Sequence, residues 1–490
     1  MKLKKLIAGL NFKIYGHIKE KEILSLVNDS RIASPNSLFI AKKGNCVDGN
    51  SFIGEAINNG SIAVVSSIYN PLYNQVVQLI TEDVEKTEAL LAKRFYEDPS
   101  SSLYVVGITG TNGKTTISFL LKHVLDKIGY FCGLIGTIKY IIGEHSFDST
   151  LTTPCNLSIQ NMMKKMICQG CKAVSMEVSS IGLLQERTRF INFNAAIFTN
   201  LTRDHLDIHK TLEAYALEKK KLFQNLSEDS IAIVNNDSCW SKFIVKDCKA
   251  TIFSYGFSNQ SDLWVSNFSL DLDKTIFEVN TKDFSQKFVI PLIGKHNIYN
   301  VLSVIALMHF QLKVSLYDLS EILKLSPIPK GRLELVPNNY CKVFVDYAHT
   351  PDALENVLSI LHEMLANRGK LIIVFGCGGD RDVEKRSLMA KVSEKYGLSI
   401  VTSDNPRTED PIKIIQDIEK GFTKKNYCIE IDRQQAISKA LEIANQDDIV
   451  LIAGKGHETY QRFAYTTIPF DDYEVALNFL SKKRICSKIE

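Results

Sequence analysis

A glycine-rich segment at residues 107–116, GITGTNGKTT, has the residue types and spacing that bind phosphate. Small residues let backbone N–H groups approach a phosphate, Lys114 supplies a positive charge, and the Thr115 hydroxyl can hold Mg²⁺ at a helix N-terminus. Ile108 stands where a strict Walker A sequence has glycine, so the segment is a variant of that pattern. A plain glycine turn is the alternative, but Gly-Lys-Thr-Thr at a strand-to-helix junction favours binding of a nucleoside triphosphate.

A second segment, SDNPRTEDP at residues 403–411, combines opposite charges in a short space. It carries a carboxylate, an amide, a proline and a guanidinium at Asp404, Asn405, Pro406 and Arg407. An anion and a cation side by side suit a ligand group that ends in an ammonium and a carboxylate, because a guanidinium pairs with a carboxylate through two parallel hydrogen bonds. The alternative is a type I turn with Asp and Pro in their usual places.

Two further segments offer metal ligands. Glu177 ends the apolar run AVSME, and Asp204, His205, Asp207 and His209 lie close together in TNLTRDHLDIHK. A carboxylate at a strand end suits Mg²⁺ when a nucleotide site is nearby, although alone it is usually a solvated residue. Two histidines four residues apart could chelate zinc on a helix, but no glutamate completes an H-E-x-x-H motif.

Apolar runs that are typical of buried strands precede these motifs. They include LYVVGI, AVSME, AAIFTN and IAIVNN, and later KVFVDY, KLIIVFG, LSIVTSD and DIVLIAG. SLFIA and IAVVSS are further predicted strands near the N-terminus. Strands alternating with helices indicate an α/β fold with parallel sheets that carry helices on both faces. Ligands bind beyond the carboxyl ends of such strands, so we expect the polar motifs to meet there.

The residues after the glycine-rich segment predict a helix. Apolar side chains recur at helical spacing at Ile117, Leu120, Leu121, Val124, Leu125 and Ile128, and Gly129 is the expected C-cap. Breaker-rich stretches at 97–102 and 326–331 are candidate linkers. They divide the chain into a mixed α/β domain at 1–98, a P-loop domain at 99–331 and a Rossmann-like domain at 332–490.

Composition excludes several classes of protein. The 490 residues are 45% hydrophobic and 23% charged, which are ordinary globular values, and a net charge of +3 predicts no nucleic-acid partner. Eleven cysteines, an odd number in a long chain, favour reduced thiols and a cytoplasmic protein. Cys168 and Cys171 form a C-x-x-C without a second pair, which disfavours a redox or zinc role. No apolar run is long enough to span a bilayer.

Taken in order, the motifs resemble those of the Mur ligases and their folylpolyglutamate synthetase relatives. Both groups are ATP-dependent enzymes that form amides through an acyl phosphate. The resemblance covers nearly the full length and includes DHLDIHK with LEKKKLF, GKHNIYN, GRLELV, VFVDYAHTPDAL, VFGCGGDRD and AGKGHETYQ. It implies a three-domain α/β ligase.

The resemblance also implies roles for individual residues. For ATP these are Gly110, Thr111, Asn112, Gly113, Lys114, Thr115, Thr116, Asn297, Arg332, Asp346 and His349. For Mg²⁺ they are Thr115, Glu177, His205 and a carbamate on Lys219, and the implied catalytic residues are Lys114, Glu177, His205 and Lys219. The residues alone favour a different interpretation of Lys219 to Lys221, as a solvated run of charge.

Substrate contacts follow from the same resemblance. The segment DSRIASPNSLFIAKKGNCVDG at 29–49 resembles the uridine-diphosphate-binding domain of members that add the third amino acid. Contacts with a UDP-muramoyl peptide carry over to Ser30, Thr152, Thr153, Ser179, Gln185 and Arg187. Contacts with meso-diaminopimelate carry over to Arg381, Asp404, Asn405, Pro406, Arg407, Gly454 and Glu458. This chain has Ile181 where most members have histidine, so no side-chain role is assigned there.

The implied activity is addition of meso-2,6-diaminopimelate to UDP-N-acetylmuramoyl-L-alanyl-D-glutamate, for peptidoglycan synthesis, by a cytoplasmic monomer that uses ATP and Mg²⁺. Folylpolyglutamate synthesis is one alternative, although it requires neither a uridine-binding domain nor the DNPR sequence. A nucleotide-dependent regulatory protein without ligase activity is another. Dinucleotide binding by GCGGDR is weakly indicated, since the G-x-G-x-x-G spacing is absent.

Overall fold

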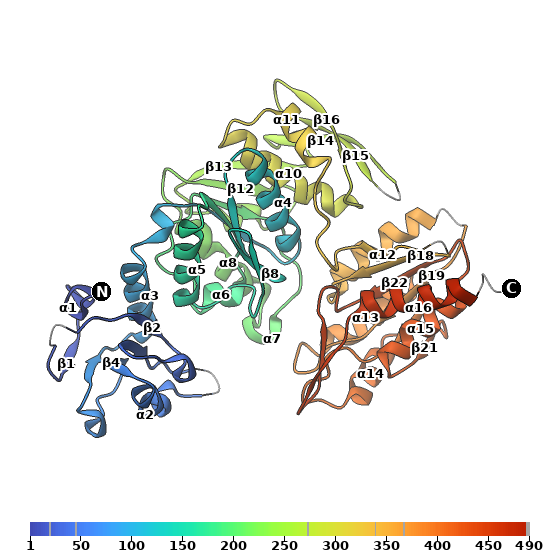
Figure 1. The fold of residues 1–490 in the computed structure, drawn as a ribbon. Helices are drawn as coiled ribbons and strands as arrows, with labels where there is room; N and C mark the ends of the chain where they lie inside the picture. Colours follow the sequence, from blue (N-terminus) through green and yellow to red (C-terminus); the bar gives the residue numbers. More distant parts are fainter. Residues whose placement is uncertain (19–20, 45–46, 272–273, 339, 366–367, 487–490) are drawn as a thin grey trace. The chain divides into compact units, whose positions relative to one another are not determined.

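The computed structural model describes all residues except 19–20, 45–46, 272–273, 339, 366–367 and 487–490 (Figure 1). The chain divides into two compact units, Met1–Gly107 with Ile128–Asn194, and Ile108–Lys127 with Ala195–Glu490. It passes from the first to the second within strand β6 (Tyr104–Thr109). The predicted domain boundaries near residues 98 and 331 stay predictions.

The first unit begins with a five-stranded sheet in the order β1-β5-β4-β3-β2. Its strands are β1 (Lys13–Tyr15), β2 (Ser25–Val27), β3 (Ser37–Ile40), β4 (Ser61–Ser66) and β5 (Val77–Ile80). All neighbours are parallel except β1, which runs antiparallel to β5 at the edge. Alternate side chains of β3 pack on opposite faces, toward α1 (Leu3–Ile7) and α3 (Val84–Phe95) or toward α2 (Ile53–Asn58). The predicted strands SLFIA and IAVVSS are confirmed as β3 and β4.

Four strands and two helices complete this unit. They are β7 (Cys132–Ile135), β8 (Lys139–Ile142), β9 (His145–Asp148), α5 (Asn156–Cys168), β10 (Ala173–Glu177) and α6 (Ser180–Leu184). Strand β10 is parallel to β7, and β8 and β9 continue in antiparallel hairpins. As predicted, β10 ends in Glu177. Helix α6 follows almost at once because the Ser179 side chain accepts a hydrogen bond from the Gly182 N–H and caps it.

The second unit opens with the predicted helix, α4 (Lys114–Lys127). Its apolar stripe from Ile117 to Leu125 is buried, and Gly129 has φ of +87° beyond its end. Strands β11 (Ala195–Phe198), β12 (Ile231–Asn235), β13 (Thr251–Gly256) and β14 (Leu263–Leu270) pair in parallel, and β15 (Thr275–Asn280) and β16 (Ser285–Ile290) extend the row antiparallel. The accompanying helices are α7 (Leu206–His209), α8 (Leu212–Gln224), α9 (Ser241–Ile244), α10 (Lys295–Phe310) and α11 (Leu316–Leu323).

The last third of the chain forms a six-stranded sheet in the order β17-β18-β22-β19-β20-β21. Its strands are β17 (Glu334–Leu335), β18 (Lys342–Asp346), β19 (Leu371–Phe375), β20 (Leu398–Val401), β21 (Tyr427–Ile429) and β22 (Ile449–Ala453). All pairs are parallel except β17 with β18. The loops after β18, β19, β20 and β22 therefore leave the same edge, and they carry the predicted motifs.

Helices cover both faces of this sheet. Ile373 and Phe375 pack with α12 (Pro351–Leu365), α13 (Glu384–Glu394) and α14 (Pro411–Glu419), whereas Ile372 and Val374 pack with α15 (Arg433–Ile443) and α16 (Asp472–Cys486). This period of two places successive side chains on opposite faces. The predicted α/β class is confirmed. Across the described residues, no helix has the length and apolar character needed to cross a membrane.

Candidate active site

The glycine-rich segment joins β6 to α4, as predicted. Gly110 and Gly113 have φ of +150° and +91°, which L side chains rarely adopt. A Cβ atom on Gly110 would lie 1.8 Å from Thr199 Oγ1, and one on Gly113 would lie 2.4 Å from Asn300 Oδ1. Both glycines are therefore required by backbone conformation and by space. The hydroxyls of Thr111, Thr115 and Thr116 belong to buried residues of the same loop.

Two side chains place positive charge at this loop. Lys114 Nζ donates hydrogen bonds to the carbonyl oxygens of Gly110 and Thr111, at 2.9 and 2.8 Å. Arg332 Nη2 donates to Thr115 Oγ1 at 3.2 Å, and its guanidinium lies 4.7 Å from the centre of the Tyr347 ring. The predicted nucleotide residues Lys114 and Arg332 thus converge on one loop.

Lys219 is the most unusual cation of the site. Its side chain is buried, donates to the Gly110 carbonyl oxygen at 2.9 Å and lies 4.4 Å from the centre of the Tyr215 ring. Burial, followed by the nearby charge of Lys114, lowers the pKa of Lys219 well below its ordinary value. The lowered pKa increases the share of the uncharged amine, which is the nucleophilic form.

The two lysines that follow are paired elsewhere. Lys220 forms an ion pair with Asp247 at 2.8 Å, and Lys221 forms one with Glu218 at 2.6 Å. Lys219 is 1% exposed and Lys220 is 6% exposed. The interpretation of residues 219–221 as a solvated run of charge is therefore wrong for the first two, because helix α8 turns them toward its packed side.

His205 stands just before α7 with φ of +54°, and His209 ends that helix. His205 Nε2 lies 3.4 Å from Asp204 Oδ2, and His209 packs against the Tyr215 ring. Burial lowers the pKa of His205, against the opposing effect of Asp204, which favours a neutral imidazole that can bind a metal. Within the described parts of the chain, no three His, Cys, Asp or Glu side chains group closely enough to hold a metal ion. The metal site stays a prediction.

In the first unit, Glu177 is completely buried at the end of β10. Its Oε1 accepts a hydrogen bond from the Thr137 N–H and its Oε2 accepts one from Thr137 Oγ1, both at 2.8 Å. A Cβ atom on Gly136 would lie 2.4 Å from Oε1, so the carboxylate fills the space that this glycine leaves. The carboxylate has a fixed direction, as a metal ligand requires.

Five of the predicted UDP-muramoyl-peptide residues form one hydrogen-bonded network in this unit. Thr153 Oγ1 donates to the Glu177 carbonyl oxygen and contacts Ser179 Oγ, at 2.9 and 3.1 Å. Arg187 Nη1 donates to the Thr153 carbonyl oxygen at 2.6 Å, and its Nε donates to Gln185 Oε1 at 2.9 Å. Thr152 joins through Thr137, with 3.0 Å between the two hydroxyl oxygens.

The sixth residue of that prediction, Ser30, is not part of this network. It follows β2 and donates to Glu55 Oε2 at 2.6 Å. Ile181, which was given no role, lies half-buried on α6, within the segment that Ser179 caps.

Three predicted ATP contacts make protein contacts near the loop. Asn297 Nδ2 donates to the Ile293 carbonyl oxygen at 2.8 Å, and its Oδ1 accepts from Asn300, the residue that meets Gly113. The two oxygens of Asp346 accept backbone hydrogen bonds at 2.6 and 2.8 Å, which shapes the turn beside Arg332. His349 contacts the Tyr347 carbonyl oxygen, and burial lowers its pKa to about 4.

The loops after β20 and β22 meet through Asn405. Its Nδ2 donates to Glu458 Oε2 at 2.7 Å, and its Oδ1 accepts from Lys455 Nζ at 3.2 Å. Gly454 has φ of +111°, and a Cβ atom there would lie 2.8 Å from Asp404 Oδ2. Glycine thus lets the Asp404 carboxylate lie close to the backbone of the β22 loop.

The loop after β19 supports Arg407. Arg407 Nη1 donates to the Gly379 carbonyl oxygen at 2.6 Å, and Gly379 N–H donates to the Asn405 carbonyl oxygen at 3.0 Å. Burial, then the charge of Arg381, lowers the pKa of Arg407, whereas the carboxylates of Asp404 and Glu458 raise it. The loops that carry the residues predicted to contact diaminopimelate therefore meet, and Pro406, which lies between Asn405 and Arg407 in the chain, is buried.

Comparison with known proteins decides the family. The Mur ligase middle domain matches residues 108–308, and the Mur ligase glutamate ligase domain matches residues 331–456. A Chlamydia pneumoniae protein, UDP-N-acetylmuramoyl-L-alanyl-D-glutamate--2,6-diaminopimelate ligase, is 46% identical over 481 residues, 98% of this chain and 99% of its own. The chain belongs to the Mur ligase family.

Solved structures agree with this assignment. A structure of a UDP-N-acetylmuramoyl-L-alanyl-D-glutamate--2,6-diaminopimelate ligase has a TM-score of 0.69 at 30% identity and covers 99% of both chains. A Mycobacterium tuberculosis folylpolyglutamate synthase, complexed with ADP and AMPPCP, has a TM-score of 0.61 at 16% identity over 75% of this Mur ligase and 92% of its own chain. At that identity the likeness shows the fold alone.

Sequence reasoning assigned no role to three residues that support the site, Thr199, Asn200 and Asn300. Thr199 donates to the Asn112 carbonyl oxygen, and Asn200 Oδ1 accepts from the Asn112 N–H. The residues that follow β11 therefore hold in place the glycine-rich segment at 107–116, which we call the phosphate loop. Asn300 was within the quoted GKHNIYN motif but was assigned no role. The polar ending of AAIFTN was the available signal for the first two.

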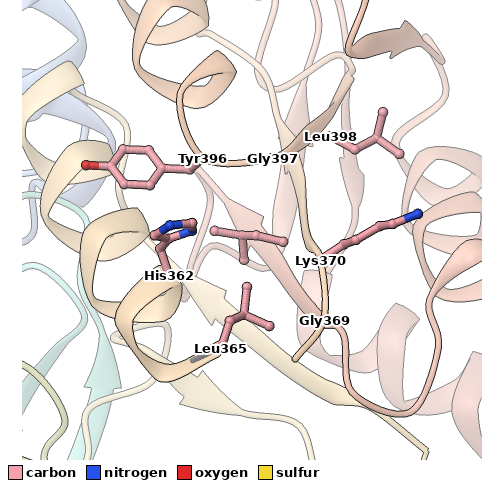
Figure 2. Close-up of a pocket in the computed structure, with 8 residues that line it drawn as sticks. His362, Leu365, Gly369, Lys370, Tyr396, Gly397 and Leu398 are labelled. Carbon is pink, nitrogen blue, oxygen red and sulfur yellow. The ribbon is translucent and has the colours of Figure 1, made fainter. Parts of the chain in front are cut away.

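A cavity of about 310 Å³ lies elsewhere in this Mur ligase (Figure 2). It is lined by His362, Leu365, Gly369, Lys370, Leu371, Tyr396, Gly397 and Leu398. Because β19 begins at Leu371 and β20 begins at Leu398, the cavity is at the amino ends of these strands. It is therefore at the edge opposite the motif-bearing loops and is not the candidate site.

Gly379→Ala is expected to destabilise the protein. The new Cβ would lie 1.9 Å from the Pro406 carbonyl oxygen, so the loops that hold Arg407 must separate. We expect a loss of about 1–3 kcal/mol in the free energy of unfolding, measured by chemical denaturation. Gly170→Ala is the control, because no atom lies within 4 Å of a Cβ there and only its φ of +81° opposes the change. Unchanged stability of Gly379→Ala would contradict this packing.

Proposed function

We propose that this Mur ligase uses ATP to join meso-2,6-diaminopimelate to UDP-N-acetylmuramoyl-L-alanyl-D-glutamate. The observation that carries the proposal is the meeting of three loops that place Asp404 and Glu458 beside Arg407. Diaminopimelate ends in an ammonium and a carboxylate on one carbon, which need an anion and a cation a few ångströms apart. The name of the Chlamydia pneumoniae relative gives that protein the same acceptor and the same amino acid.

In the first chemical step, the phosphate loop binds ATP. Backbone N–H groups and Lys114 bind the phosphates of ATP, and the γ-phosphoryl group passes to the D-glutamyl γ-carboxylate to give an acyl phosphate and ADP. An amine of diaminopimelate then attacks the acyl carbon through a tetrahedral intermediate. The C–N bond forms, the nitrogen loses one proton, the bond from carbon to the phosphate oxygen breaks, and phosphate leaves. No side chain has to act as covalent nucleophile.

Lys219 supports the proposed metal site through a carbamate. Burial favours the uncharged form of the Lys219 amine, which is the form that attacks CO₂; the new N–C bond forms, the nitrogen loses one proton, and a carbamate anion results. The Thr115 hydroxyl, the His205 imidazole and this carbamate offer donors that suit Mg²⁺, and Glu177 stays a predicted ligand from the sequence. When bound, Mg²⁺ neutralises charge on the transferring phosphoryl group.

Phosphate release tests the proposal against its alternatives. The assay contains ATP, Mg²⁺ and UDP-N-acetylmuramoyl-L-alanyl-D-glutamate, with a panel of amino acids that includes diaminopimelate, L-lysine and glutamate. Release that depends on both the muramoyl peptide and diaminopimelate supports the ligase. Release with a folate and glutamate would instead indicate folylpolyglutamate synthesis, and no acceptor-dependent release would favour a regulatory protein.

Lys114→Ala should abolish turnover and leave the fold intact, because Lys114 Nζ donates to two carbonyl oxygens of its own loop and the change removes no apolar core side chain. Loss of one such electrostatic donor commonly costs about 2.7–4 kcal/mol of transition-state stabilisation, roughly 10²–10³ in rate. Lys122→Ala is a matched control on the same helix, since Lys122 pairs with Asp126. Substantial activity in Lys114→Ala would exclude the phosphate-binding assignment.

Lys219→Ala should be nearly inactive, and short carboxylic acids should restore part of the rate by standing in for the carbamate. Lys221→Ala is the control, because Lys221 is partly exposed and paired with Glu218. Mass spectrometry of the wild type in bicarbonate should detect the modified lysine. An unmodified Lys219 together with no rescue counts against this role.

Arg407→Ala should lower kcat/KM for diaminopimelate on the order of a hundredfold, about 3 kcal/mol, because a desolvated carboxylate loses its partner. The wild type should prefer meso-diaminopimelate to L-lysine, whose side chain lacks that carboxylate. Arg368→Ala, at an exposed arginine of the same sheet's opposite edge, is the control. Equal use of both amino acids by the wild type would falsify the specificity.

A further inference from the structure

A buried arginine lies behind the amino-acid loops. Arg433 begins α15, and its side chain is completely buried. Its Nε and Nη2 each lie 2.7 Å from an oxygen of Asp472, and Nη2 also donates to the Ala453 carbonyl oxygen at 2.9 Å. Asp472, at the start of α16, is equally buried. Neither residue belongs to a motif singled out in the sequence.

The third nitrogen of this guanidinium is directed at the site. Arg433 Nη1 is buried without a hydrogen-bond partner and lies 4.0 Å from Asp404 Oδ2. A second buried cation, Lys455 Nζ, lies 3.2 Å from Glu458 Oε2. Each carboxylate of the proposed ammonium site therefore has its own buried cation behind it.

The charges in this part of the site do not cancel. Three carboxylates, Asp404, Glu458 and Asp472, face two cations, Arg433 and Lys455, so three negative charges less two positive charges leave a net charge of −1. An uncompensated buried charge is costly, and an incoming ammonium removes that cost. Arg407 adds a positive charge on the side of the loop after β19, beside Gly379, where the ligand's carboxylate is proposed to bind.

We propose that Arg433, locked onto Asp472, and Lys455 are positioning residues that keep Asp404 and Glu458 ionised, so that this half of the site has a net charge of −1 and selects the side-chain ammonium. The inference rests on the proposed function, which it deepens. Burial raises the pKa of Asp404, but Lys455, Arg433 and a hydrogen bond from the Asn405 N–H act together with other nearby charge to hold it below its ordinary value, whereas burial and Asp404 raise the pKa of Glu458. Glu458 is therefore the carboxyl that would take up a proton if a cation were removed.

Other titratable groups around these carboxylates do not change their protonation state near neutral pH. Burial lowers the pKa of His349 to about 4 and that of His457 to about 3, so both are neutral. Burial raises the pKa of Cys377 to about 12 and raises those of Tyr347 and Tyr460. A pH dependence that appears on removal of a cation can then be assigned to the carboxylates.

Lys455→Met tests the inference in the phosphate-release assay. With the cation gone, the pKa of Glu458 rises further, and its carboxyl takes up a proton more readily and loses its attraction for the ammonium. The KM for diaminopimelate should rise at least about tenfold at pH 7 and fall again as the pH increases, because Glu458 then loses that proton. The KM values for ATP and for the muramoyl peptide should not change, and Lys420→Met, at an exposed lysine of the same domain, should resemble the wild type.

A second variant distinguishes the effect of the altered net charge from the effect of a local structural change at Lys455. Lys455→Met with Glu458→Gln restores the net charge of −1, so its KM should be independent of pH even if it stays high. Arg433→Gln should reproduce the pH-dependent KM if Lys455→Met does not fold. A KM that is unchanged, or raised equally at every pH in both single variants, overturns the inference. Failure of the proposed function would appear instead in the wild type, as no phosphate release with diaminopimelate.

Discussion

The expense of taking charged side chains out of water is the constraint on which the rest of this structure depends. Moving an ion into a protein interior costs several kcal/mol unless fixed partners replace its hydration. Lys219, Arg433 and Lys455 are each almost fully buried, as is Arg386, which holds Glu409 and Asp417 at 2.8 and 3.1 Å. Such partners must be held in direction, so the loops that carry them must be rigid. Parallel strands that end at one edge of a sheet provide that rigidity.

The sequence predicted those parts of the fold and site whose cause is local. Gly110 and Gly113 are specified by a left-handed backbone within one loop, and the α4 stripe is specified by its period. The pairing of Arg433 with Asp472 joins residues 39 positions apart and has no local pattern. Lys219 could not be told from Lys220 and Lys221 by residue type, because the rotation of α8 against its neighbours decides which lysine is buried. Asn300 was missed because its role is to fit beside a glycine of a distant segment.

Fold and specificity have separate origins in this Mur ligase. The likeness to a folylpolyglutamate synthase extends over 75% of the chain at 16% identity, so the architecture persists where little of the sequence does. The proposed choice of amino acid instead depends on the side chains of loops that share one sheet edge. A scaffold of this kind can exchange acceptors without rebuilding its core.

Arg407 has φ of +53°, a backbone conformation that disfavours most residues with a side chain by about 1–2 kcal/mol. Glycine or asparagine would relieve that strain, so folding stability alone pushes this position away from arginine. Only continued selection for the guanidinium itself opposes that drift. In a lineage whose added amino acid no longer presented a carboxylate, this arginine would be lost early. Position 407 would then show the change of substrate before the surrounding fold changed.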